Sequence, residues 1–152
     1  IERGEARAAG DEPVTDLRVR AGGLAPVLVG AGEAPGLIDE LPMIAVLAAF
    51  ARGTSEIRGA RELRVKESDR IATVAAALRA AGGTVEELED GWIITGKGAL
   101  RGGRIEAAGD HRVAMAFLVA GLASKEGITV EGADAAAVSD PEFIARLRSL
   151  RR

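Results

Sequence analysis

The chain has 152 residues, of which 47% are hydrophobic and 28% are charged, a balance typical of a globular protein with a buried core. The formal net charge of −3 argues against nucleic-acid binding through a broad basic surface. The absence of cysteine excludes disulfides, thiolate catalysis and thiolate metal sites. Because His111 is the single histidine, we expect no transition-metal site.

The longest apolar runs, at residues 43–51 and 113–123, are too short to cross a bilayer. The first residues show no signal-peptide pattern, so a cytoplasmic protein is expected. The chain opens on Ile1 without an initiator methionine, which suggests a piece of a longer protein; a trimmed methionine is the alternative.

Apolar periodicity predicts four helices. They are expected at residues 41–52, 68–81 and 111–124, with a fourth that begins at Pro141. Gly53 and Gly82 follow the first two, as is common at helix ends, and Asp140 is placed to cap the fourth.

Segments of strand character lie between these helices. They are expected at residues 14–20, 26–29, 55–58, 84–89, 92–95, 104–107 and 127–131. Asp90-Gly91 separates two of them and predicts a hairpin turn.

An internal repeat connects the two halves of the chain. Residues 56–60 (Glu-Ile-Arg-Gly-Ala) resemble residues 129–133 (Thr-Val-Glu-Gly-Ala), 73 positions later. An alanine-rich helix precedes each copy, and a loop and another helix follow. The repeat predicts two helix–strand–helix–strand–strand units, the second truncated, in an α/β layer arrangement.

Three polar clusters are predicted at helix starts. The first is Asp39-Glu40, the second is Arg64-Val-Lys-Glu-Ser-Asp-Arg70, and the third is Asp110-His111-Arg112. The repeat offset aligns Asp39 with Arg112, so these two clusters are expected at one end of the fold. Lysine and arginine at a helix N-terminus oppose the helix dipole, and such a broken rule is typical of functional sites. Helix N-termini with several cations would form a pocket for phosphate and carboxylate groups.

Structural alternatives stay open for each cluster. Lys66, Glu67 and Arg70 are spaced to share a helix face, where alternating charges commonly form solvated salt bridges. Asp39 and Asp110 are well placed as helix N-caps. A lone histidine such as His111 is commonly structural. From physical reasoning alone, the chain is an anion-binding α/β domain.

The specific motifs narrow this further. Three segments, in this order and at this spacing, resemble signatures of the 5-enolpyruvylshikimate-3-phosphate synthase family: Leu37-Ile-Asp-Glu-Leu-Pro-Met43, Leu63-Arg-Val-Lys-Glu-Ser-Asp-Arg-Ile71 and Gly109-Asp-His-Arg-Val-Ala-Met-Ala116. Residues 10–20 and 139–143 are similar to further parts of the family pattern, so the resemblance covers essentially the whole chain.

The resemblance implies a transferase of the shikimate pathway of aromatic amino acid biosynthesis. Its substrates would be phosphoenolpyruvate and shikimate 3-phosphate, it would need no metal or organic cofactor, and glyphosate would occupy the phosphoenolpyruvate position. The implied fold has βαβαββ-type units in two domains with the active site between them. Residues 1–152 would form a single partial domain, the C-terminal portion of that enzyme.

The resemblance also implies roles for single residues. Asp39 would contact the shikimate hydroxyls and accept the 5-hydroxyl proton, Lys66 would lie near the reacting oxygen, and Glu67 would handle the proton on the methylene carbon. Arg70 and Arg112 would bind the phosphoenolpyruvate carboxylate, with His111 beside them. Proton transfers and two anionic substrates do require this combination of carboxylates and cations.

Two departures from the family pattern matter. Val138 stands where some members have a phosphate-binding lysine. The chain is also less than half as long as a complete member, and the missing N-terminal part would carry most shikimate 3-phosphate contacts. The isolated chain is therefore expected to be inactive, and to pair with that missing part or with another copy of itself.

Two other readings compete with this one. The chain also resembles the UDP-N-acetylglucosamine enolpyruvyl transferases, which share this architecture but lack the motif found here at Arg64–Arg70. A non-catalytic module used for anion binding or oligomerisation is the alternative from a different functional class.

Overall fold

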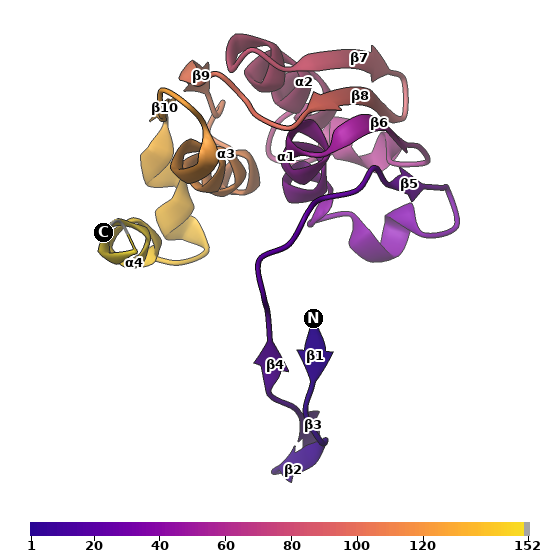
Figure 1. The fold of residues 1–152 in the computed structure, drawn as a ribbon, viewed down its shortest axis with the longest axis vertical. Helices are drawn as coiled ribbons and strands as arrows, with labels where there is room; N and C mark the ends of the chain where they lie inside the picture. Colours follow the sequence, from indigo (N-terminus) through magenta and orange to yellow (C-terminus); the bar gives the residue numbers. More distant parts are fainter. Residues whose placement is uncertain (151–152) are drawn as a thin grey trace.

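A four-stranded sheet forms one half of the body of the protein, whose computed structural model describes residues 1–150 (Figure 1). Its strands run in the order β5-β6-β8-β7 and span Leu28–Val29, Arg52–Ile57, Gly91–Lys97 and Thr84–Leu88. β5 is parallel to β6, whereas β8 is antiparallel to both β6 and β7. β7 and β8 form the hairpin that Asp90-Gly91 predicts.

Helices α1 (Leu41–Phe50) and α2 (Arg70–Ala80) pack on this sheet. α1 provides the crossover between the parallel strands β5 and β6, and α2 connects β6 to β7. The fully buried Trp92 of β8 donates a hydrogen bond from its indole N–H to the Ile71 carbonyl of α2 at 2.9 Å. This bond satisfies the polar atom of the largest core side chain and fixes α2 against the sheet.

The second half repeats the first, as the sequence predicts. Strands β9 (Gly103–Glu106) and β10 (Ile128–Glu131) are parallel, and α3 (His111–Ala123) connects them. Short helices follow β6 and β10 in the same way: η2 (Arg61–Val65) precedes α2, and η3 (Ala133–Val138) precedes α4 (Phe143–Ser149). The strand pairing recurs too, because Glu56 of β6 faces β5 and its counterpart Thr129 of β10 faces β9. The mixed helix and strand architecture confirms the α/β prediction.

Residues 1–20 form an arm that extends away from the body (Figure 1). The single strand predicted at residues 14–20 is wrong: two short antiparallel pairs, β1 with β4 and β2 with β3, take its place. Their bounds are Glu2–Arg3, Leu17–Arg18, Arg7–Ala9 and Glu12–Val14. Leu17 and Val19 are 60% and 70% exposed, so within residues 1–150 no second layer packs on this segment to hold a longer strand straight.

Three helix boundaries differ by two residues from the sequence prediction. α1 ends at Phe50 because Ala51 is already extended and Arg52 begins β6. α2 begins at Arg70 rather than Ser68, since Asp69 is its N-cap and accepts a hydrogen bond from the Ala72 amide at 3.0 Å. α4 begins at Phe143 rather than Pro141.

The core lies where α1, α2 and α3 meet, and it is built from aliphatic and alanine side chains around Trp92 and Phe117. Alanine-rich helices can approach closely, which brings the three helix N-termini near one another. In residues 1–150, no helix is both long enough and apolar enough to span a membrane.

Candidate functional site

The three polar clusters of the sequence converge on the side chain of Arg70. This residue is the first of α2 and its side chain is only 1% exposed. Its Nε donates to Asp110 Oδ2 at 2.8 Å, its Nη1 to Asp39 Oδ1 at 3.1 Å, and its Nη2 to Glu67 Oε2 at 2.5 Å. Each guanidinium nitrogen therefore has its own carboxylate, and the three carboxylates come from the starts of three different helices.

Asp110 connects the parts of this cluster through four hydrogen bonds. Its carboxylate is fully buried and is the N-cap of α3, where Oδ1 accepts from the backbone amides of Arg112 at 2.9 Å and Val113 at 3.4 Å. Its other oxygen accepts from Arg70 and from the Ser68 hydroxyl at 3.0 Å. One side chain thus fixes Arg70, Ser68 and the first turn of α3 together.

Burial and charge act in opposite directions on this pair. Burial favours the protonated form of Asp110, but the hydrogen bonds and the charge of Arg70 outweigh it, so the pKa of Asp110 lies below its ordinary value. Burial likewise opposes the charged form of Arg70, and its carboxylate partners raise the pKa of Arg70 above its ordinary value. Both groups are therefore ionised at neutral pH.

Arg112 lies at the open edge of the cluster and its side chain is 32% exposed. Its Nη1 donates to Glu40 Oε1 at 3.0 Å, and its Nη2 lies 3.5 Å from Asp39 Oδ2. Asp39 therefore connects both arginines, which confirms the proximity of Asp39 and Arg112 that the repeat predicts. Sequence reasoning gave Glu40 no separate role, although its position next to Asp39 in the first cluster was the available signal.

Lys66 does not lie where the spacing places it. It follows η2 in an extended conformation, before α2 begins, so it cannot share a helix face with Arg70. Its ammonium pairs instead with the Glu62 carboxylate. Asp39 is not the N-cap of α1 either. That position belongs to Glu40, whose side chain makes no capping hydrogen bond.

Arg64 has a structural role that the sequence did not single out. Its guanidinium donates to the Asp69 and Glu87 carboxylates at 2.9 and 3.1 Å and to the carbonyls of Leu88 and Glu89 at 2.6 and 2.8 Å. It connects the start of α2 to the β7–β8 hairpin, and so supports the segment that carries Lys66 and Glu67.

His111 and Val138 are the two predicted positions that remain. His111 is the first residue of α3 and is half-buried. In the chain it stands between Asp110 and Arg112. Val138 ends η3 with 78% of its surface exposed. The neighbouring Ser139 lines a cavity that Arg112 also lines. Neither Val138 nor Ser139 is a cation.

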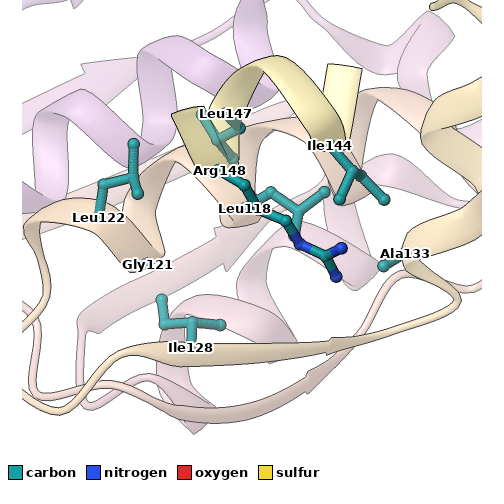
Figure 2. A pocket seen from close by; sticks show the side chains of 8 residues that line it. All are labelled: Leu118, Gly121, Leu122, Ile128, Ala133, Ile144, Leu147 and Arg148. Carbon is teal, nitrogen blue, oxygen red and sulfur yellow. The ribbon is translucent and has the colours of Figure 1, made fainter. Parts of the chain in front are cut away.

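An amphipathic cavity of about 270 Å³ opens beside Arg112. Its polar rim is formed by Asp39, Glu40 and Arg112, and its other lining residues are Met43, Met115, Ala116, Val119, Ser139 and Phe143. A second cavity of about 260 Å³ lies between α3, β10 and α4 (Figure 2). Arg148 is the one charged residue among the eight that line it, and none of the eight is a carboxylate or a histidine, so this lining offers no acid–base chemistry.

The low pKa of Asp110 predicts an acid-sensitive fold. A carboxyl whose pKa is lower in the folded than in the unfolded state stabilises the fold at every pH above the unfolded value of about 3.9. That stabilisation is lost as the pH falls through the folded pKa. We expect the urea midpoint of unfolding to fall as the pH is lowered below about 4, and to fall less in the Asp110→Asn variant. Parallel curves for the two proteins would contradict this account.

Comparison with known proteins places these features in a family. Residues 6–147 match the family model described as EPSP synthase (3-phosphoshikimate 1-carboxyvinyltransferase). The 3-phosphoshikimate 1-carboxyvinyltransferase of Geobacter sulfurreducens is 52% identical over 147 residues, which cover 97% of this chain and 34% of that protein. The protein of the same name from Aquifex aeolicus is 50% identical over 138 residues, 90% of this chain and 32% of that protein.

A solved structure agrees. The EPSP synthase from Acinetobacter baumannii superposes with a TM-score of 0.89 at 38% sequence identity, over 97% of this chain and 35% of that chain. This chain thus spans about a third of the length of the relatives that it matches. The family match covers nearly all of the chain, and the chain belongs to the EPSP synthase family.

Proposed function

We propose that this chain forms one wall of the active site of a transferase that moves the enolpyruvyl group of phosphoenolpyruvate to the 5-hydroxyl of shikimate 3-phosphate. The observation that carries the proposal is the convergence of three separate family signatures on Arg70, through Asp39, Glu67 and Asp110. Convergence of distant polar segments at one point, with a cavity beside them, is the arrangement expected of a functional site.

The chemistry of the reaction gives each side chain a task. Addition requires removal of a proton from the 5-hydroxyl and delivery of a proton to the methylene carbon, for which Asp39 and Glu67 are the proposed groups. Both carboxylates are about half exposed, so substrate can reach them. Arg70 and Arg112 would bind the phosphoenolpyruvate carboxylate, because guanidinium groups match carboxylates in shape and charge.

Two further residues would complete this wall. Lys66, whose side chain is 27% exposed, would turn from Glu62 towards the reacting oxygen. His111 would border the carboxylate site from the start of α3. Because Val138 supplies no cation, we propose that the phosphate group relies on Lys66 and on cations outside this chain.

The rest of the substrate contacts are proposed to lie in the part of the protein that this chain does not span. Residues 1–152 would be a partial domain, and the isolated chain is expected to release no phosphate from the two substrates. This chain and the part that it does not span must lie close together, because catalysis depends on holding two reactants in one geometry.

A chimera tests the proposal. In the Geobacter sulfurreducens relative, the matching third would be replaced by this chain, which is 52% identical to it. We expect the chimera to release phosphate from phosphoenolpyruvate when shikimate 3-phosphate is present, and not when it is omitted. A chimera that is folded by circular dichroism but shows no turnover would contradict the proposal.

A further inference from the structure

Arg70 cannot receive a ligand in the conformation that the structure shows. Its side chain is 1% exposed, and its Nε, Nη1 and Nη2 each donate to a protein carboxylate. The cluster is also acidic: Arg70 and Arg112 face the four carboxylates of Asp39, Glu40, Glu67 and Asp110. An anionic ligand therefore has to take the place of a carboxylate that already occupies the arginine.

The three carboxylates on Arg70 differ in how firmly they are held. Asp110 is fully buried and accepts four hydrogen bonds, including two from the α3 backbone, so moving it would uncap a helix. Asp39 lies between Arg70 and Arg112 and contacts both. Glu67 is 47% exposed and contacts Arg70.

The backbone around Glu67 also favours movement. Residues 66–69 lie between the end of η2 and the start of α2 and are in neither helix. A glutamate has three rotatable side-chain bonds. Glu67 pairs with Arg70, whereas Asp39, which is similarly exposed, pairs with both Arg70 and Arg112. Glu67 is therefore the carboxylate that can leave Arg70 at the lowest cost.

Resting on the proposed function, we infer that the carboxylate of phosphoenolpyruvate binds Arg70 by displacing Glu67 from Nη2. The exchange replaces one charge-assisted hydrogen bond with another, while Asp110 keeps Nε in place. It also releases the Glu67 carboxylate next to the bound substrate, where its proposed role in proton transfer requires it. One event thus binds the substrate and frees Glu67.

Titration of the 152-residue chain with phosphoenolpyruvate tests the exchange. Followed by NMR, the wild type should bind weakly, and the Glu67→Gln variant about two- to tenfold more tightly, since the neutral amide competes poorly for Arg70. Glu89→Gln is the matched control: Glu89 is 73% exposed and pairs with Arg61, so the same charge change occurs away from Arg70. In the wild type, the ¹³C signal of the Glu67 carboxyl should move on titration and that of Asp110 should not.

Equal or weaker binding by Glu67→Gln than by wild type would overturn the inference, and so would tighter binding by Glu89→Gln to the same extent. Failure of Glu67→Gln to bind at any concentration would also overturn it, because removing the competitor should open Arg70. These results leave the proposed function untouched, since turnover of the chimera tests that separately.

Discussion

Replacing Asp110 with alanine is expected to be the most destabilising single change in the site. The variant leaves the Arg70 guanidinium buried without the partner of its Nε, and breaking a buried pair on one side costs about 3–5 kcal/mol. It also removes the N-cap of α3, which is worth about 0.5–2 kcal/mol. Together these losses are a large fraction of the stability of a domain this size, so we expect a large fall in the urea midpoint.

A second capping aspartate separates the two contributions. Asp69 caps α2 through the Ala72 amide at 3.0 Å, but its side chain is 40% exposed and its cation partner Arg64 keeps other acceptors. Asp69→Ala should therefore cost about 1 kcal/mol, close to the value of a cap alone. If Asp110→Ala and Asp69→Ala lowered the free energy of unfolding equally, the buried pair with Arg70 would contribute nothing.

Much of the fold follows from local patterns in the sequence. The Asp90-Gly91 turn predicted the β7–β8 hairpin, and the 73-residue repeat predicted that a unit of helices and strands recurs. The same offset predicted that Asp39 lies beside Arg112, since equivalent residues of two packed units lie at the same end of the fold. These features depend on periodicity and turn chemistry, which are visible in one sequence.

The centre of the site depends on tertiary packing and was not predicted. Ser68 and Asp69 are both good N-caps, so the pattern alone could not fix the start of α2. With the helix starting at Arg70, Lys66 leaves the helix face and pairs with Glu62. Arg70 becomes buried because Asp110, 40 residues later in the chain, lies against it. No spacing rule connects residues so far apart.

The arrangement also sharpens the view of Arg70 as a binding residue. Its resemblance-implied role is to hold a substrate carboxylate, yet the structure shows it holding three carboxylates of the protein. The two descriptions are compatible if the protein carboxylates preorganise the guanidinium and one of them gives way. A site of this kind costs stability in the absence of ligand, as functional sites commonly do.

Asp39 carries the largest expected effect on catalysis. In the chimera, Asp39→Asn should lower kcat by about 10²–10⁴-fold, the contribution of a general base, because an amide cannot accept the 5-hydroxyl proton. The change is nearly isosteric, so its amide oxygen can still accept a hydrogen bond from Arg70 Nη1, which lies 3.1 Å from Asp39 Oδ1. The KM for phosphoenolpyruvate should therefore change much less than kcat.

Glu40 provides the matched control for this prediction. Glu40 lies between Asp39 and α1, is 63% exposed, and pairs with the same Arg112 at 3.0 Å. Unlike Asp39, it is not among the three carboxylates that pair with Arg70. Glu40→Gln removes the same charge at nearly the same place and should leave kcat within about threefold, as expected for an exposed pair. Steady-state phosphate release by the three chimeras decides the matter: equal losses in the two variants would reduce the role of Asp39 to general electrostatics, whereas a loss confined to Asp39→Asn would identify it as the proton acceptor.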